Sequence, residues 1–372
     1  MTGKMKVLQV SEYFAPHIGG VEKVVAEIAG YLYDKGIGVA VYCGKFKSSK
    51  MIDRKMKYKV IRSPLVNLPR LAALSFILFS RVFRYSKISE YDIVHAHNSP
   101  SLLAIPKIDK KIILTIHGNY PHSFKYLSKF TVVSVLAGII ENIAIRRADV
   151  ITVVNSERAN EIKRLHPNKK VYYIPNFVDT EVFKPLKINK EKNSLVYVGT
   201  LHAIKNVDVL IKSISIVKSK SKNVKLYVIG DGIQKGYLMD LVSKLGLKNN
   251  VFFEGIKNSS EIVWYYNRCI ATILPSSNEG FPLVVLESLA CGTPVIATAT
   301  NEVVSLIRDK ELLISCIDDK LLASKILHIF DKNKKEGFEL RQSVIERYGK
   351  KMVLDKYLHI YLSLVSKRYD HK

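Results

Sequence analysis

Short runs of β-branched and aromatic residues alternate along the chain with longer segments in which apolar residues recur at helical spacing. This alternation is typical of βαβ units built around a buried parallel sheet. The runs form two successive sets and therefore predict two Rossmann-like halves. The strands expected in the first set are residues 7–11, 39–43, 59–62, 93–97, 112–117, 151–154 and 171–174. Those expected in the second set are residues 195–198, 226–229, 251–253, 270–274, 295–297 and 312–315.

A polar stretch without periodicity, residues 184–193, separates the two sets and contains Pro185. We interpret this stretch as a linker between domains. The length of 372 residues also favours two domains over one. We therefore expect a first domain over residues 1–185 and a second domain over residues 186–350.

The chain is strongly basic, with 58 Lys and Arg against 33 Asp and Glu and a net charge of +25. Such a charge indicates attraction to an anionic partner such as phosphate, acidic lipid or nucleic acid. In the more basic first half, Arg70, Arg81, Arg84 and Lys87 flank or interrupt an apolar segment, residues 71–83. This pattern is similar to an interfacial amphipathic helix. A core helix whose basic residues face solvent is the alternative.

The four cysteines form no Cys-x-x-Cys pair, and the first residues lead into a strand pattern rather than a secretory signal. No apolar run reaches the roughly 20 residues that a membrane-spanning helix needs. We therefore expect a reduced, cytoplasmic protein without a transmembrane segment.

Two glycines, Gly19 and Gly20, follow the first expected strand and open the first expected helix. Glycines at such a turn let the backbone approach a ligand, and the free N–H groups of a helix start favour an anion. The two glycines lack the spacing of a dinucleotide site. A purely structural turn is the alternative.

Two carboxylates, Glu279 and Glu287, lie between an expected strand and the end of the helix that follows it. In a nucleotide-sugar site, one carboxylate would bind the sugar and the other the ribose diol through charge-assisted hydrogen bonds. Backbone amides of the same turn would bind phosphate oxygens; these are the amides around Phe281, Leu283 and Val284. Taken alone, an acidic residue here could instead complement the helix dipole or face solvent.

The two glutamates and the Ala-Cys-Gly-Thr-Pro-Val segment after them resemble the signature of glycosyltransferase family 4, the retaining enzymes of the GT-B fold. Other landmarks similar to those of the family occur in the same order at residues 19–22, 115–118, 148–156, 174–176, 197–205, 230–232 and 253–255. The resemblance covers essentially the whole chain. It implies an α/β GT-B fold with two Rossmann-like domains facing each other across a cleft, and a final helix within residues 351–372 that crosses back to the first domain.

In enzymes of this family the nucleotide-sugar donor binds mainly to the second domain. By resemblance, Glu287 binds the ribose, Glu279 lies near the sugar and Lys205 contacts the phosphates as a point charge. Ile256 offers its backbone to the base. The resemblance therefore implies donor-binding and catalytic roles for this group of residues.

The first domain contributes His117, which corresponds to the family's histidine beside the transferred sugar, and Gly19 and Gly20, which close over the diphosphate. The implied reaction transfers a hexosyl group, with retention, from a nucleotide diphosphate sugar to a hydroxyl. In the route implied, the leaving phosphate oxygen accepts the proton of the acceptor. The resemblance implies neither an essential metal nor a cofactor.

Three positions depart from the family pattern. Thr200 stands where the family usually has arginine, so half of the expected cationic clamp is missing. Asn301 and Glu302 lie near the places of the family's Gly-Gly and following glutamate. Phe177 replaces the usual glycine after Ile-Pro-Asn. These departures favour an unusual donor or weak activity over a different fold.

The charge of the first half suggests an acceptor carried on a lipid, as in surface-polysaccharide assembly, and peripheral docking on an anionic membrane at its inner face. A soluble acceptor is the alternative. One rival hypothesis is a basic nucleic-acid-binding or scaffold protein with a decayed transferase site, and another is a GT-B sugar epimerase. The chain has no recognisable nucleic-acid module, so we expect no nucleic-acid partner.

His95 and His97 project from one face of an expected strand, and His117 ends a neighbouring one. This placement raises the question of a metal site. Nearby sequence supplies no cysteine or carboxylate to complete one. We therefore expect no metal here, and we expect these histidines to line a cleft or to hydrogen bond locally.

Overall fold

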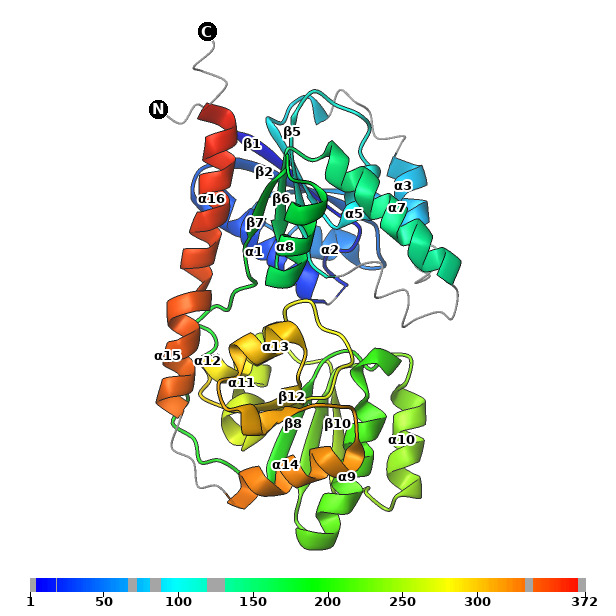
Figure 1. The fold of residues 1–372 in the computed structure, drawn as a ribbon, viewed down its shortest axis with the longest axis vertical. Helices are drawn as coiled ribbons and strands as arrows, with labels where there is room; N and C mark the ends of the chain where they lie inside the picture. Colours follow the sequence, from blue (N-terminus) through cyan, green and yellow to red (C-terminus); the bar gives the residue numbers. More distant parts are fainter. Residues whose placement is uncertain are drawn as a thin grey trace. The chain divides into compact units, whose positions relative to one another are not determined.

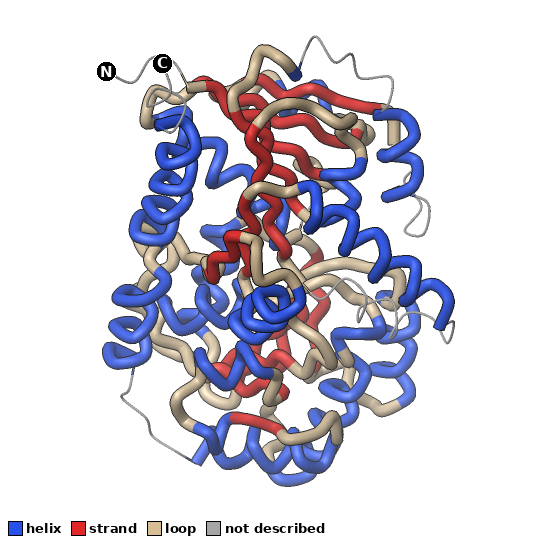
Figure 2. Tube along the Cα trace, turned by 45° about the horizontal axis from the view of Figure 1, so that its top comes forward, coloured by secondary structure: helices blue, strands red, loops and turns tan. Residues whose placement is uncertain are grey.

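The computed structural model describes residues 5–17, 19–65, 72–80, 88–118, 131–331 and 337–366. The chain divides into two compact units (Figure 1): unit 1 comprises Met1–Pro175 and Val353–Lys372, and unit 2 comprises Asn176–Met352. Each unit contains a parallel sheet with helices on both of its faces (Figure 2). The fold is therefore α/β with two Rossmann-like units, as the alternation of strand and helix patterns predicts.

Unit 1 contains a parallel sheet with the strand order β3-β2-β1-β4-β5-β6-β7. Its strands are β1 (Lys6–Ser11), β2 (Gly38–Gly44), β3 (Lys59–Ser63), β4 (Ile93–His97), β5 (Lys111–Ile116), β6 (Val150–Val153) and β7 (Lys170–Tyr173). Its helices are α1 (Gly20–Asp34), α2 (Ser49–Asp53), α3 (Ala72–Ser80), α5 (Ser99–Leu103), α7 (Thr131–Arg147) and α8 (Ser156–Leu165). Each strand expected from the sequence in this unit is present, with ends that differ by at most one residue.

The two faces of this sheet bury different side chains, because successive residues of a strand point to opposite sides. On one face Val10, Leu114 and Val153 belong to a single apolar core with residues of α3, α5, α7 and α8. On the other face α1 packs Val25 and Ala29 against β2. Helix α1 forms because its apolar residues recur at helical spacing from Val21 to Leu32.

Unit 2 repeats this plan with the strand order β10-β9-β8-β11-β12-β13. Its strands are β8 (Ser194–Val198), β9 (Lys225–Ile229), β10 (Val251–Gly255), β11 (Ala271–Leu274), β12 (Val295–Thr298) and β13 (Leu313–Ile314). Its helices are α9 (Val207–Lys220), α10 (Lys235–Lys244), α11 (Ser259–Arg268), α12 (Leu283–Ala290), α13 (Asn301–Leu306), α14 (Asp319–Asp331) and α15 (Gly337–Tyr348), with the short 3-10 helices η1 (Ala203–Lys205) and η2 (Lys310–Leu312).

The division between the units lies earlier than the predicted linker, between Pro175 and Asn176. The polar stretch 184–193 is attached to unit 2, because Lys190 Nζ donates hydrogen bonds to a backbone carbonyl and a threonine hydroxyl there. Glu191 forms ion pairs with a lysine and an arginine of the same unit. A polar composition indicates a surface segment, but it does not show that the segment has specific partners.

The last helix, α16 (Lys350–Ser366), starts in unit 2 and belongs to unit 1 from Val353 onward. It is drawn in red in Figure 1. The side chains that it buries include Leu354, Tyr357 and Tyr361. A final helix that returns to the first half is what the family resemblance implies.

Helix α3 covers the middle of the predicted amphipathic segment. Phe76 is fully buried and packs against Tyr42 with ring centroids 5.6 Å apart. Leu78 and Phe79 are 52% and 43% exposed. The flanking Arg70, Arg81, Arg84 and Lys87 lie outside the described residues. None of the helices in the described ranges combines the length and apolar character needed to cross a bilayer.

Candidate functional site

The charged residues singled out in unit 2 meet at the point where the strand order of its sheet reverses. Strands β8 and β11 are neighbours in this sheet. The chain goes from β8 to β9 on one side and from β11 to β12 on the other, so the strand order reverses between β8 and β11. Ligands of doubly wound folds bind at the carboxyl ends of such strands. Lys205 follows β8 in η1, and Glu279 follows β11.

The loops after β8 and β11 are joined by an ion pair and by hydrogen bonds. Lys205 Nζ lies 2.7 Å from Glu279 Oε1, and the two side chains are only 22% and 12% exposed. The Asn206 amide donates to the carbonyl of Pro275 and to Ser277 Oγ, each at 2.8 Å. The structure thus brings the predicted phosphate-binding lysine and the predicted sugar-binding glutamate together as one pair.

Glycines allow the loops after β8 and β9 to approach each other closely. Gly230 has a φ of +136°, and a Cβ on it would lie 1.9 Å from the carbonyl oxygen of Gly199. The N–H of Gly230 donates to the carbonyl of Gly255, the last residue of β10. Any larger residue at position 230 would separate the loops that frame Lys205.

Helix α12 starts a few residues after Glu279, and its first backbone amides have no side-chain cap. Its N-cap residue is Pro282. Asn176 Nδ2 donates to the carbonyl of Phe281 at 2.9 Å and holds the turn that leads into the helix. Leu283 and Val284, the first two helical residues, are half-buried. A helix start of this kind favours an anion.

The second glutamate lies deeper in the same helix. Glu287 is 6% exposed and accepts a hydrogen bond from the Tyr266 hydroxyl at 3.3 Å. Burial and this carboxylate raise the pKa of Tyr266, so the hydroxyl remains a donor.

Ile256, the predicted base-contacting residue, is 58% exposed after β10. Thr200 is exposed, and its carbonyl accepts a hydrogen bond from Tyr197.

In unit 1 the strand order reverses between β1 and β4, and Gly19 and Gly20 follow β1. Gly19 is the N-cap of α1, with no side-chain cap. The carboxylate of Glu22 folds back over it, so that a Cβ on Gly19 would lie 2.3 Å from a Glu22 oxygen. Glu22 pairs with His17 Nδ1 at 2.6 Å. In the structure a carboxylate neighbours this helix start, and its charge opposes that of a diphosphate.

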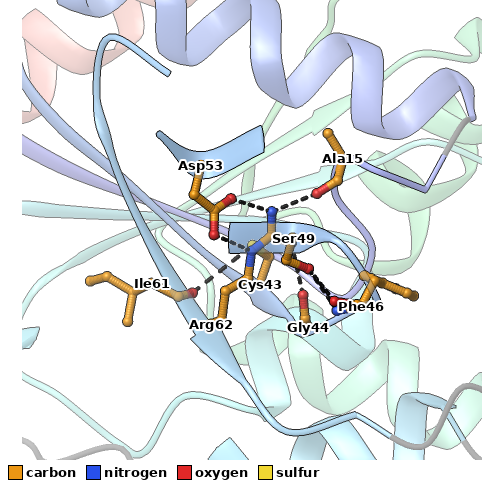
Figure 3. A network of polar contacts seen from close by, with 8 residues as sticks. All are labelled: Ala15, Cys43, Gly44, Phe46, Ser49, Asp53, Ile61 and Arg62. Atoms are coloured by element: carbon orange, nitrogen blue, oxygen red, sulfur yellow. Dashed lines mark hydrogen bonds and ion pairs between the residues drawn. The ribbon is translucent and has the colours of Figure 1, made fainter. Parts of the chain in front are cut away.

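The segment between β1 and these glycines is held by Arg62 of β3 (Figure 3). The guanidinium donates to the carbonyl of Ala15 at 2.5 Å and to the carbonyl of Gly44 at 2.9 Å. It also binds both oxygens of Asp53, at 2.6 and 3.2 Å. Bidentate pairing of this kind fixes direction as well as distance, so the approach to Gly19 is anchored to the sheet.

Two of the three histidines singled out in unit 1, His97 and His117, hydrogen bond to each other, whereas His95 hydrogen bonds to Thr115 and Tyr361. His97 Nδ1 lies 2.9 Å from His117 Nε2, and both residues are buried. Burial lowers the pKa of His117 to about 3, so its ring is neutral at physiological pH. His117 can therefore act toward a ligand as a neutral hydrogen-bonding group. Within the described residues no cluster of three or more His, Cys, Asp or Glu is arranged to hold a metal ion.

Sequence reasoning missed several residues that shape these sites. Asn206 has a φ of +49°, and an asparagine between a lysine and a helix was a detectable signal. Burial raises the pKa of Glu12 to about 7, which makes it an additional acid or base at the end of β1. Asn176, Tyr266 and Arg62 act through contacts far apart in sequence, and no local pattern reveals such contacts.

Two family models match successive parts of the chain. The model described as Glycosyltransferase Family 4 matches residues 18–182. The model described as Glycosyl transferases group 1 matches residues 178–352. Together they span nearly all of both units.

Curated relatives and solved structures agree with these matches. N-acetyl-alpha-D-glucosaminyl L-malate synthase of Bacillus anthracis is 25% identical over 316 residues, which cover 77% of this chain and 79% of that protein. Alpha-monoglucosyldiacylglycerol synthase of Streptococcus pneumoniae is 24% identical over 335 residues, or 82% and 74% of the two chains. The structure of Anabaena HepE in complex with UDP and glucose superimposes with a TM-score of 0.77 at 18% identity, covering 96% of this chain and 100% of that one. The chain therefore belongs to glycosyltransferase family 4 and has the GT-B fold.

Proposed function

We propose that this glycosyltransferase uses a nucleotide diphosphate sugar as its donor and that the donor binds to unit 2. The observation that carries the proposal is the meeting of Lys205, Glu279 and the uncapped start of α12 at the point where the strand order reverses. A diphosphate matches the lysine and the helix amides, and a sugar hydroxyl matches the carboxylate. The relative HepE, crystallised with UDP and glucose, supports this choice of ligand.

The ion pair suggests how the charges are used. Glu279 holds Lys205 at 2.7 Å, so the ammonium group is already in place before an anion arrives. As the bond between sugar and phosphate breaks, negative charge develops on the leaving diphosphate, and a preorganised cation stabilises it without further rearrangement. Glu287, buried behind the helix start, is assigned to the ribose hydroxyls.

We further propose that transfer proceeds with retention, without an essential metal or cofactor. In this route the acceptor hydroxyl attacks the face that the diphosphate leaves, and the departing phosphate oxygen takes its proton. Lys205 and the α12 amides stabilise the phosphate, and His117, with Gly19 and Gly20, meets the sugar and diphosphate from unit 1. Glu22 has to turn away from Gly19 for the diphosphate to approach those glycines.

The acceptor that we propose is carried on a lipid or is a surface-polysaccharide intermediate, with the enzyme docked peripherally on the cytoplasmic face of a membrane. Four large apolar side chains of α7 are 45% to 56% exposed, namely Val135, Leu136, Ile139 and Ile143. Exposed apolar groups on a chain of net charge +25 suit an anionic lipid surface. The name of the pneumococcal relative, a glucosyldiacylglycerol synthase, agrees with a lipid acceptor.

The test of the donor is a panel of UDP-, GDP- and ADP-sugars, with binding measured by calorimetry and transfer measured on lipid and soluble acceptors. We expect one base to bind, and we expect NMR of the product to show the anomeric configuration of the donor. An inverted product would refute retention. Binding of nucleic acid with strong salt dependence, and of no nucleotide sugar, would instead support the rival hypothesis of a nucleic-acid-binding protein or scaffold.

A further inference from the structure

One face of the unit 1 sheet carries a row of buried polar side chains beneath α16. The row includes side chains from strands β1, β4, β5 and β6, from the residue that follows β5, and from α16. In chain order they are Gln9, His95, His97, Thr115, His117, Thr152 and Tyr361. Each is at most 8% exposed. Burying a polar group is unfavourable unless it is hydrogen bonded, so this row requires partners for its members.

The row follows from strand register. Gln9 lies beside His95, His97 lies beside Thr115, and Thr115 lies beside Thr152. Residues at the alternating positions of the same strands form the apolar core on the opposite face. The polar character is therefore confined to the face on which Tyr361 of α16 lies.

The side chains are hydrogen bonded in one continuous chain. From His117 inward, Nε2 of His117 lies 2.9 Å from Nδ1 of His97, and Nε2 of His97 lies 2.7 Å from Oε1 of Gln9. The amide nitrogen of Gln9 donates to the Tyr361 hydroxyl at 2.9 Å, and that hydroxyl lies 2.5 Å from Nδ1 of His95. The chain ends through Thr115 and Thr152, with contacts of 2.6 and 2.5 Å.

The Gln9 amide determines which nitrogen of each imidazole carries the proton. Burial lowers the pKa of all three histidines, so each ring is neutral and has one donor and one acceptor nitrogen. Because Oε1 of Gln9 can only accept, His97 must donate from Nε2. His97 Nδ1 is then an acceptor, and His117 must donate to it from Nε2. This leaves Nδ1 of His117 as an unprotonated acceptor, with no hydrogen-bond partner among the described residues.

In the structure the nitrogen of that amide faces Tyr361. The oxygen of Tyr361 accepts from the amide nitrogen of Gln9, and its proton goes to Nδ1 of His95, which in turn donates from Nε2 to Thr115. Reversal of the Gln9 amide would reverse every donor in the chain and place the proton of His117 on Nδ1. The helix that returns from unit 2 therefore supplies the hydrogen-bond partner of the amide on which the tautomer of His117 depends.

We propose that Gln9, His97 and Tyr361 are positioning residues that hold His117 with its proton on Nε2 and present Nδ1 as an acceptor to a hydroxyl of the transferred sugar. This inference rests on the proposed function, in which the sugar meets His117. The inference adds that unit 1 recognises the transferred sugar through one hydroxyl of that sugar, which donates a hydrogen bond to His117. This recognition depends on α16 being packed on the sheet of unit 1.

The direct test is long-range ¹H–¹⁵N correlation NMR of histidine-labelled protein, which distinguishes the two neutral tautomers. In the wild type we expect His117 to be protonated on Nε2, and a proton on Nδ1 or an average of both forms would overturn the proposal. Tyr361→Phe should lose the single tautomer, because the Gln9 amide then keeps only its contact with His97 and can bind that ring in either orientation. If that variant does not fold, Gln9→Leu removes the same link. A single, unchanged tautomer in either folded variant would also overturn it.

Tyr357→Phe is the matched control, since it removes the same atom from the same helix one turn earlier. Its hydroxyl bonds to Thr115 and Thr152, at the far end of the chain, and not to Gln9. The links between Tyr361, Gln9, His97 and His117 stay intact in this variant, so we expect the wild-type tautomer there. An equal loss in both variants would mean that only helix packing matters and would refute the role of Tyr361.

In turnover, Tyr361→Phe should lower kcat roughly 10- to 100-fold at an unchanged KM for the donor. Absence of transfer by the wild type would contradict the proposed function, whereas the spectra decide the tautomer independently.

Discussion

The two units place chemically different groups on parallel sheets of the same kind. Unit 2 places a charged pair, Lys205 and Glu279, on loops where both side chains remain partly exposed. Unit 1 places neutral histidines in its interior, where burial lowers their pKa values to about 3 for His95 and His117. The comparison shows that one Rossmann-like scaffold can offer charge at a loop edge and a fixed tautomer inside a sheet. The first suits an anion, and the second suits a neutral hydroxyl.

The largest expected effect is on the charged side of this comparison. Lys205→Ala should lower kcat by about 10²–10³, because the leaving diphosphate loses a preorganised cation. Binding of the free nucleoside should change little. The measurement is steady-state kinetics together with calorimetry. Lys235→Ala is the control, because Lys235 pairs with Asp231 on an exposed surface and should retain wild-type turnover. Unchanged turnover in Lys205→Ala would refute the role of the lysine.

A second prediction separates the two glutamates. Glu287→Ala should weaken nucleotide binding by about 1.5–3 kcal/mol, the value of a charge-assisted hydrogen bond, which corresponds to a Kd roughly 10- to 150-fold higher. Glu279→Ala should lower turnover more than binding, since it also frees Lys205 from its pair. Calorimetry with the nucleotide and with the nucleotide sugar distinguishes the two. The same defect in both variants would contradict the division between ribose and sugar.

The third prediction tests the neutral side through pH. A histidine whose folded pKa lies below its unfolded value of about 6.5 takes up a proton on unfolding, so stability falls as pH decreases from about 6.5 toward 3. At pH 5 the loss is about 2 kcal/mol for each of His95 and His117. Glu12 opposes this, because its raised pKa of about 7 makes the folded state bind a proton first as pH decreases.

Urea unfolding at pH 7, 6 and 5 measures the balance. We expect a net loss of stability toward pH 5, a steeper loss in Glu12→Gln and a shallower one in His117→Asn. A stability that does not vary between pH 7 and 5 in the wild type and in Glu12→Gln would show that the histidines are not held neutral.

The sequence predicts much more of the fold than of the sites. Each strand is visible because a buried parallel strand needs a continuous apolar run, as in residues 226–229. Lys205 and Glu279 could be named from the family resemblance, but their ion pair depends on β8 and β11 being neighbours. The chain from His117 to Tyr361 joins residues more than 200 positions apart, as the contact between His95 and Tyr361 shows. Periodicity reports only which face a residue occupies and carries no information about such a partner.

The smallest expected effect concerns the loop geometry that supports the charged pair. Asn206→Gly removes the hydrogen bonds to Pro275 and Ser277 but keeps the left-handed backbone, at φ +49°, without strain. We expect a loss of about 1 kcal/mol in donor affinity, because the two loops lose their side-chain link while Lys205 and Glu279 remain. Asn206→Ala, which adds backbone strain, should be worse, and its excess over glycine measures that strain. Calorimetry at fixed ionic strength decides. If the glycine variant binds the donor as tightly as the wild type does, the Lys205–Glu279 pair and the backbone hydrogen bond from Ser277 to Ile204 suffice to hold the loops. The charged site then needs no side-chain support comparable to the hydrogen-bonded chain of unit 1.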